Sequence, residues 1–505
     1  MSTLDQDLAR LQTAKTNIKT AINAKGGTLT DNDGFADFPQ AILNLPGQAG
    51  SITPSNIKSL VEPNSLAYDL ASLVDAKIDI GNAIAAKGGT VTSSDGLEDF
   101  SSLISDLSTS HVYGFHISSS VSDPSNAVTY LEDAVGKTPA GMNYTSGTFS
   151  YGSWDSDEFF MPRPCMLNSN GTVAYYLNPN DYTKKADGTA SDIANTSFNG
   201  NAMMEWGRDG KKIWYKIVPD SGDNTSASIY IADSQVDNSY HAYNFIKSDG
   251  SYVDHFYTPI YNGSLVNNKL RSISGQSCMV SKTADNEIAY ATANGSGWYT
   301  ETWSDTELIN ILLILLGKSL DTQTVFGRGN MNGGSVISTG TMNVKGLFWG
   351  KNASSSSDNS GVKVFGMENY WGNIWRRIAG MLYTTTNGYM VKYAYGTSDG
   401  STSSRYSTSG TGYINTGIKG TKGSSNYLDK MNFSSGKMLP STTNASKTIY
   451  YCDYAYWATN SSTTAYASRG GFYGIGWGCG AFSLNVYNAA SFSHSSLGAA
   501  LSFRG

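Results

Sequence analysis

The stretch "RGGFYGIGWGCGAFSLNVYNAASFSHSSLGAALSFRG" (residues 469–505) sets large side chains in a background of Gly, Ala, Ser and Asn. The large residues are Phe472, Tyr473, Ile475, Trp477, Tyr487, Phe492 and His494. Their spacing fits neither the stripe of a helix nor the alternation of a strand. A second set does alternate and is assigned to the core: Phe482, Leu484, Val486, Leu497, Leu501 and Phe503. We therefore predict a regular frame that carries irregularly placed bulky residues.

Upstream of this stretch lie a helix signal and two aromatic-rich segments. "TWSDTELINILLILLG" (302–317) is apolar on all sides, which indicates a buried helix. Ser304 and Glu307 match a capping box, and Gly317 is expected to end the helix. "GVKVFGMENYWGNIWRRIAGM" (361–381) and "KTIYYCDYAYWAT" (447–459) are typical of strands.

This order of motifs resembles the C-type lectin-like fold, as used by formylglycine-generating enzymes and by the variable proteins of diversity-generating retroelements. In that group a "GM.GN.W" stretch precedes "RGG", a loop-bearing segment and a final "GFR"-like strand. Here "GMENYWGNIW", Arg469-Gly470-Gly471 and Ser502-Phe503-Arg504 take those places. The resemblance covers residues 300–505 and implies a lectin-like domain over that range.

The two branches of the group imply different functions. The oxygen-using enzymes carry two cysteines after the Gly-Gly pair, at places that fall near Ile475 and Gly480 in this chain. Cys479 stands alone there, and Arg376 replaces an acidic residue that is usual in that branch. Copper-dependent oxidase chemistry is therefore not expected.

The retroelement variable proteins are the more similar branch. Their last segment is copied from a template in which mutagenised adenines turn AAY codons for Asn into any NNY codon. With Asn at the scattered positions, this tail resembles such a template; Trp477 is the exception, because no NNY codon encodes Trp. The candidate ligand-binding, variable positions are Phe472, Tyr473, Gly474, Ile475, Trp477, Gly478, Ser483, Tyr487, Phe492, His494 and Ser496.

Displayed aromatic residues suit recognition, because they offer a large contact area at a low entropic cost. The alternative is that these aromatic residues fill a core. Their lack of helix or strand periodicity favours display.

Near the start of the chain one pattern occurs twice, in residues 3–45 and 65–107, offset by 62. Apolar residues spaced three and four apart place a stripe on one helix face in each copy. The matched positions are Leu4, Leu8, Leu11, Ala14, Ile18 and Ile22 in the first copy and Leu66, Leu70, Leu73, Ala76, Ile80 and Ile84 in the second. A second short helix should follow in each copy, bearing Phe38 and Ile42 or Phe100 and Ile104. A unit this small should pack against its sibling or a symmetry mate.

The repeat resembles segments of tailed-phage tail and baseplate proteins, which implies attachment or oligomerisation. A plain structural spacer is the alternative. Between the repeats and the lectin-like range, "GTVAYYLNP", "KKIWYKIVPD" and similar segments predict short strands joined by polar turns.

Enzyme and metal signals are weak in that middle region. Asp155, Asp157 and Glu158 in "SWDSDEFF" could serve a glycosidase, although a solvated acidic loop is the better interpretation. His111 and His116 have no evident third ligand, so no metal site and no cofactor are expected.

Composition narrows the class of protein further. Charged residues make up only 15% and the net charge is −6, so a nucleic-acid partner is not expected. The N-terminal residues lack the apolar core of a secretory signal, and "LINILLILL" (308–316) is too short to span a membrane. The four cysteines are widely separated and are expected to be buried free thiols: Cys165, Cys278, Cys452 and Cys479.

The sequence thus predicts an α+β protein. Its expected parts are helical attachment repeats (1–46 and 65–108), a linker (47–64), a β-rich middle (111–299) and a C-type lectin-like domain (300–505). The expected function is that of a receptor-binding protein in a phage tail, made in the host cytoplasm and assembled into the virion. Its expected partners are a host-surface protein or glycan, other tail proteins and two further copies in a homotrimer. The alternatives are a tail protein without a receptor role and a glycan-active or oxidase-like enzyme.

Overall fold

The computed structural model describes residues 4–44, 66–86, 89–105, 110–247, 250–352, 361–393 and 412–505. Helices and many strands occur together in these ranges, so the chain has the predicted mixed α+β composition. It forms two compact units, Met1–His111 and Val112–Gly505. The predicted linker, 47–64, lies outside the described residues.

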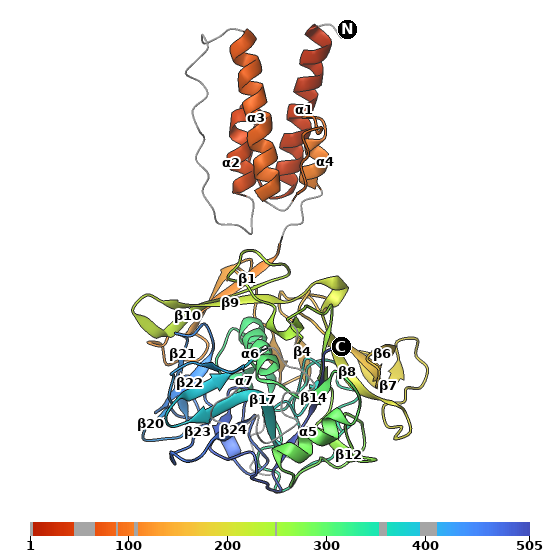
Figure 1. Cartoon of the computed structure of the whole chain (residues 1–505), viewed down its shortest axis with the longest axis vertical. Coiled ribbons are helices and arrows are strands. Elements are labelled where there is room, and N and C mark those ends of the chain that lie inside the picture. Colours follow the sequence, from red (N-terminus) through yellow and green to blue (C-terminus); the bar gives the residue numbers. More distant parts are fainter. Residues whose placement is uncertain are drawn as a thin grey trace. The chain divides into compact units, whose positions relative to one another are not determined.

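In its described residues the first unit has two long and two short helices (Figure 1). They are α1 (Leu4–Ala24), α2 (Phe38–Leu43), α3 (Leu66–Ala86) and α4 (Phe100–Ser105), with a 3-10 turn η1 (Phe35–Asp37) before α2. The repeat therefore produces the long and short helices that its apolar spacing predicts. Leu8 differs from the prediction, because its side chain is 54% exposed instead of facing the core.

The two copies of the repeat pack across each other. Helix α1 packs mainly against α4, and α3 mainly against α2. One shared core results, and it includes Ile18, Phe38, Ile80 and Phe100, all of them buried. Each copy therefore buries its apolar stripe with the help of the other.

The turns after the long helices repeat as well. The carboxylate of Asp33 accepts the backbone N–H of Thr30, and Asp95 accepts that of Thr92 in the second copy. Gly26, at φ 97°, supplies the left-handed residue just after α1.

The second unit contains three larger sheets and several short pairs. The first sheet is antiparallel, in the order β2 (Val128–Glu132), β1 (Val112–Ile117), β10 (Asp223–Ala232), β9 (Trp214–Asp220). The second has the order β14 (Trp298–Thr300), β27 (Leu501–Phe503), β11 (Phe256–Pro259), β8 (Gly200–Trp206), β5 (Arg163–Asn168), β6 (Val173–Asn178), β7 (Asp181–Lys185). The third has the order β19 (Ile414–Asn415), β18 (Gly388–Val391), β17 (Trp375–Thr384), β24 (Ala465–Arg469), β25 (Leu484–Val486), β23 (Ala455–Trp457), with β26 (Leu497–Ala499) paired to β17.

Shorter strands complete the unit. A three-stranded sheet has the order β20 (Thr421–Lys422), β22 (Leu439–Thr443), β21 (Leu428–Asn432). The two-stranded pairs are β3 (Gly141–Asn143) with β4 (Thr148–Ser150), β12 (Ser264–Val266) with β13 (Lys269–Arg271), and β15 (Lys363–Val364) with β16 (Met367–Glu368). The helices are α5 (Ala284–Thr292), α6 (Trp303–Gly317) and α7 (Thr322–Phe326).

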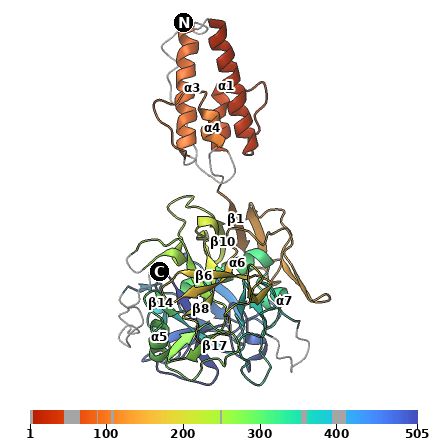
Figure 2. The same ribbon diagram turned by 90° about the vertical axis from the view of Figure 1, so that its right-hand side faces the viewer.

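Helix α6 lies in the middle of the second unit, where the sheets surround it (Figures 1 and 2). All of its residues are buried, as its all-round apolar sequence predicts. The predicted capping box is wrong, because the Thr302 hydroxyl caps the helix by accepting the N–H of Asp305. Glu307 instead points inward and accepts hydroxyl hydrogen bonds from Tyr215 and Tyr393, each at 2.8 Å. Gly317 is the last residue of the helix, and Lys318 takes the left-handed conformation after it.

The final strand joins parts of the unit that are distant in sequence. Strand β27 pairs with β14 on one side and with β11 on the other, so the second sheet takes strands from 163–300 and from 501–503. The guanidinium of Arg504 pairs with the buried carboxylate of Asp305 in α6, at 2.5 Å. The ranges 111–299 and 300–505 therefore meet within one sheet of one compact unit.

The described ranges bear on two predictions made from composition: the state of the cysteines and whether a helix could span a membrane. Cys165, Cys278, Cys452 and Cys479 are all free and buried, as expected. Across the described ranges, none of the helices combines the length and the apolar character that a membrane crossing requires.

Candidate binding face at the C-terminal loops

Two loops near the C-terminus carry the bulky residues singled out by the sequence. The first loop, residues 472–483, connects β24 to β25, and the second loop, residues 487–496, connects β25 to β26. Both start and end on strands of the third sheet, whose described residues in β17 and β24 are buried. The frame is therefore regular and packed, while the loops extend from its strand ends.

Buried charges hold the strand before the first loop. The Arg469 guanidinium pairs with the carboxylate of Glu301 and donates to the carbonyl of Tyr370 at 2.7 Å. Gly471 then turns at φ 78°, and a Cβ there would lie 2.6 Å from the Cys479 sulfur. No larger residue fits this turn without moving the thiol, which explains the Gly after "RG".

The first loop is organised around Trp477. The Arg328 guanidinium carbon lies 3.1 Å from a Trp477 ring centroid, and the Lys447 ammonium lies 4.7 Å from one. Two cations thus contact the indole, an arrangement favoured by the electron-rich ring face. The Gln323 amide also donates to the Trp477 carbonyl at 3.1 Å, so this tryptophan is fixed in place.

The remaining large residues of the first loop are half-buried. The rings of Phe472 and Tyr473 meet edge to face at 5.3 Å. The Tyr473 N–H donates to the Asn373 carbonyl, which connects the loop to the turn before β17. Ile475 is half-buried against the core, and Gly474 is exposed.

The second loop is the more exposed of the two. Tyr487 is 51% and Phe492 40% exposed, and His494 is also exposed. The rings of Phe492 and His494 lie parallel, with centroids 6.2 Å apart. Large side chains held in solvent are a feature of recognition surfaces.

A buried ion pair holds the second loop from below. Arg377 of β17 donates to the carbonyls of Phe492 and Lys282. Its guanidinium also lies 2.9 Å from the carboxylate of Glu287 in α5. Burial raises the pKa of Glu287 to about 7, although Arg377 opposes that shift. The second loop is thus held by an arginine that pairs with a buried carboxyl.

A row of aromatic rings connects the two loops. We call Trp375, Tyr456, Tyr454 and Tyr427 the aromatic row; successive ring centroids are 6.3, 5.8 and 4.4 Å apart. At one end the backbone N–H of Trp375 donates to the Ser496 carbonyl in the second loop. Further along, the Tyr454 N–H donates to the Gly478 carbonyl in the first loop. Backbone hydrogen bonds thus connect the row to both loops, and we call the two loops and the row together the candidate binding face.

Eight of the eleven candidate positions are exposed or half-buried: Phe472, Tyr473, Gly474, Ile475, Trp477, Tyr487, Phe492 and His494. The other three are buried and are not displayed. Gly478 lies under the Tyr454 ring, where a Cβ would approach to 2.2 Å. Ser483 is fully enclosed, and the buried Ser496 hydroxyl lies 2.8 Å from His494 Nδ1.

The thiol beside this face is not exposed. Cys479 is completely buried, and its sulfur lies 3.3 Å from the Phe472 carbonyl. Burial raises the pKa of the Cys479 thiol well above its usual range, so it stays protonated at neutral pH.

Several residues of the candidate binding face were not identified from sequence. Arg328 and Lys447 lie far from Trp477 in the chain, and no local pattern connects them to it. Tyr454 and Tyr456 could be placed together from sequence, because their two-residue spacing in "YCDYAYW" matches one face of a strand. Arg377 lies in the aromatic-rich segment 361–381, where no local pattern distinguishes it.

Within the described ranges, no three His, Cys, Asp or Glu side chains gather as metal ligands would. No protein-family model matches this chain, and comparison with curated proteins finds no match.

Proposed function

We propose that this chain is a receptor-binding protein of a tailed phage or prophage and that the candidate binding face contacts the host surface. The observation that carries the proposal is the exposure of Tyr487 and Phe492 on a loop whose base is fixed by buried Arg377. Binding residues commonly lie on loops that a rigid scaffold positions. The ligand is a host-surface protein or glycan, and no catalytic step is involved.

The proposal includes a lectin-like fold for residues 300–505 and diversification of the two loops. It is supported by a difference in burial between two sets of residues in this region. The alternating residues, such as Leu484 and Val486, are buried in strands, and most of the scattered ones lie at the surface. Changes at the surface positions would alter the ligand without disturbing the core.

The helical repeats are proposed to attach the protein to the tail, and three copies are proposed to assemble. Three heads on one particle would raise the effective concentration of each remaining face once one has bound. Weak single contacts would then add up to stable attachment of the virion.

Sequencing of the gene segment that encodes residues 469–505 in sister isolates, with the DNA that follows it, tests the diversification. The expected result is variation at Phe472, Gly474, Ile475, Tyr487, Phe492 and His494, with AAY codons in a near-copy. Codons for the buried frame should stay constant, and the enclosed positions 478, 483 and 496 should accept only small residues. Invariant codons and the lack of a near-copy would refute the diversification.

Binding of the labelled full-length protein to a panel of bacterial strains tests the receptor role. Replacing Tyr487 and Phe492 together by Ala should abolish binding to strains that the parent recognises. Tyr252→Ala is the matched control, because Tyr252 is 45% exposed but lies outside both loops. Equal binding by the double variant would favour a tail protein without a receptor role.

A further inference from the structure

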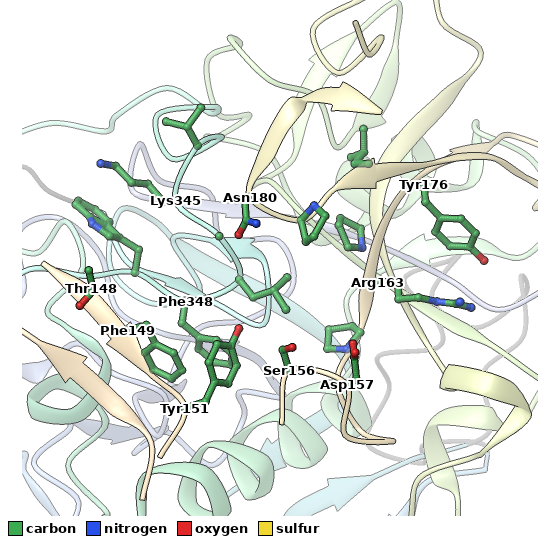
Figure 3. Close-up of a pocket in the computed structure, with 18 of the residues that line it drawn as sticks. Thr148, Phe149, Tyr151, Ser156, Asp157, Arg163, Tyr176, Asn180, Lys345 and Phe348 are labelled. Atoms are coloured by element: carbon green, nitrogen blue, oxygen red, sulfur yellow. The ribbon is translucent and has the colours of Figure 1, made fainter. Parts of the chain in front are cut away.

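A concave site lies in the second unit and shares no residue with the candidate binding face. It is an open cleft of about 710 Å³, within the range of known small-molecule sites. Its walls come from the segment around β4, from β5, from the turn between β6 and β7, and from residues 344–349 (Figure 3). Segments far apart in the sequence thus converge on one hollow.

One side of the cleft is aromatic. Phe149 and Phe348 stack with centroids 4.4 Å apart and an angle of 12° between the rings. Tyr151 is perpendicular to both, at 5.0 Å from Phe149 and 5.9 Å from Phe348. Because the three rings hold one another, this apolar wall is formed before any ligand arrives.

The other side is polar and its charged groups are fixed. Figure 3 shows Arg163, Asp157 and Tyr176 across the cleft from the three rings. Arg163 pairs with the buried carboxylate of Glu205 at 2.8 Å and lies over the Tyr176 ring at 4.7 Å. The carboxylate of Asp157 pairs with Arg208 at 2.6 Å. Guanidinium donors and carboxylate acceptors are therefore presented side by side in set positions.

Two further polar groups, Asn180 and Lys345, lie along the remaining edge (Figure 3). Both are exposed, and the Lys345 ammonium is 5.1 Å from the Trp349 ring centroid. Among the described residues, no carboxylate lies within ion-pair distance of Lys345. The cleft therefore offers one positive charge that a ligand carboxylate can neutralise.

This combination matches the chemistry of a sugar. A sugar ring presents C–H groups on its faces, which pack on aromatic rings, and hydroxyl groups at its rim, which both donate and accept hydrogen bonds. An extended peptide fits less well, because peptide recognition by strand addition needs free backbone N–H groups. Pro162, Pro164 and Pro179 all line this cleft and have none.

We infer that the cleft binds a short acidic oligosaccharide, with sugar faces against Phe149 and Tyr151, which the buried Phe348 supports from behind, and a sugar carboxylate at Lys345. The inference does not rest on the proposed receptor role. It would hold even if the candidate binding face had no ligand, because the two sites share no side chain.

Saturation-transfer NMR and calorimetry with the full-length protein test the inference. The probes are a galacturonic acid trimer, a glucuronate-containing tetrasaccharide, a mannuronate trimer and the methyl ester of the galacturonic acid trimer. At least one acidic probe should bind, and added salt should weaken that binding. The methyl ester of the galacturonic acid trimer, which is neutral, should bind more weakly than the acid. Lys345→Ala should weaken the acidic probe about fivefold, an amount typical of an exposed charge contact.

Two further variants separate the contributions. Phe149→Ala should weaken acidic and neutral probes alike, because it removes a ring from the wall. Lys422→Ala is the matched control for Lys345, since it removes an exposed lysine outside the cleft. The double variant at Tyr487 and Phe492 should leave sugar binding unchanged, so failure of either proposal is recognised separately.

Three results would overturn the inference. The first is no binding by any member of the panel. The second is equal binding of acid and ester together with no effect of Lys345→Ala, which would refute the acidic class. The third is binding that persists in Phe149→Ala and Lys345→Ala, which would place the ligand elsewhere.

Discussion

At the scale of single residues, two glycines of the first loop have opposite surroundings. A Cβ at Gly478 would meet the ring of Tyr454 at 2.2 Å, and that ring belongs to the aromatic row. A Cβ at Gly474 would meet only the outer edge of the Phe472 ring, at 2.8 Å, and this side chain can turn away. Gly474 and Gly478 are both candidate variable positions, but only Gly478 is enclosed by neighbours that cannot easily move.

We expect Gly478→Ala to lower the free energy of unfolding by about 1–3 kcal/mol, as overpacking in a core does. Gly474→Ala, its matched control, should change it by less than about 0.5 kcal/mol. Urea unfolding followed by tryptophan fluorescence measures both. Equal costs at the two positions would contradict the described packing of the first loop.

Glu287, under the second loop, gives a pH dependence with a definite sign. Its pKa is raised from 4.5 to about 7, chiefly by burial. Between these pH values the folded chain keeps a proton that the unfolded chain has lost, so the free energy of unfolding falls as pH rises. The contribution is fully present below pH 4.5 and is lost by pH 7, at most about 3 kcal/mol in all.

Glu287→Gln should flatten this fall, because the amide does not titrate. The measurement is urea unfolding at several pH values between 4.5 and 8, for the parent and the variant. Asp285→Asn, which removes an exposed carboxylate from the same helix turn, should leave the slope as it is. An unchanged slope in Glu287→Gln would show that the carboxyl titrates normally.

Residue-scale prediction from sequence succeeded where periodicity applied. The alternating residues around Leu484, which their spacing places in the core, are buried. The prediction that Gly478, Ser483 and Ser496 are displayed is wrong, because a codon pattern carries no information about which neighbour covers a side chain. The contact of Arg328 and Lys447 with Trp477 could not be predicted from sequence either, because only the fold brings these residues together.

At the scale of elements, the helical repeats are interlocked. Because α1 packs on α4 and α3 on α2, neither copy of the repeat has a complete core by itself. Loss of one short helix should therefore weaken both long helices.

Phe38→Ala removes a fully buried ring of α2, and a cost of about 3–5 kcal/mol is typical of such a cavity. We expect amide hydrogen exchange in the full-length protein to accelerate in α1 and α3 together. Gln40→Ala, on the exposed side of the same helix, should leave both protected. Faster exchange in only one long helix would mean that the copies are independent.

Elements with a strong period were predictable, and their ends were less so. The repeats, the buried α6 and strands β1, β6, β9 and β10 follow from the spacing of apolar residues. The start of α6 did not, because Ser304 and Glu307 fit a local capping pattern but are used by distant partners. Arg504 donates to the Ser304 hydroxyl, and Tyr215 and Tyr393 donate to Glu307.

At the scale of the whole molecule, the chain should unfold in two steps that match its two compact units. Calorimetry of the full-length protein should show one transition for residues 1–111 and another for 112–505. Phe38→Ala should lower the first midpoint and leave the second unchanged. A separate third transition for 111–299 would contradict the shared second sheet.

The same reasoning applies to a fragment. Residues 112–299 alone lack α6 and β27, which leaves β11 paired on one side only, with β8, and the core without its central helix. We expect this fragment to give poorly dispersed NMR spectra, whereas 112–505 should give well dispersed ones. The sequence indicated neither result, because pairing between residue 257 and residue 503 depends on the assembled fold.

The place of β27 inside the second sheet also bears on how the protein is made. The ribosome makes this strand after all the other strands of the sheet, yet the strand fills the gap between β14 and β11. At about 5–20 residues per second, synthesis of the second unit takes roughly 20–80 seconds, and the nascent sheet lacks an inner strand throughout. Chaperones would therefore meet an open sheet edge until this strand has been made and has paired. Translation would also produce the candidate variable loops just before this closing strand.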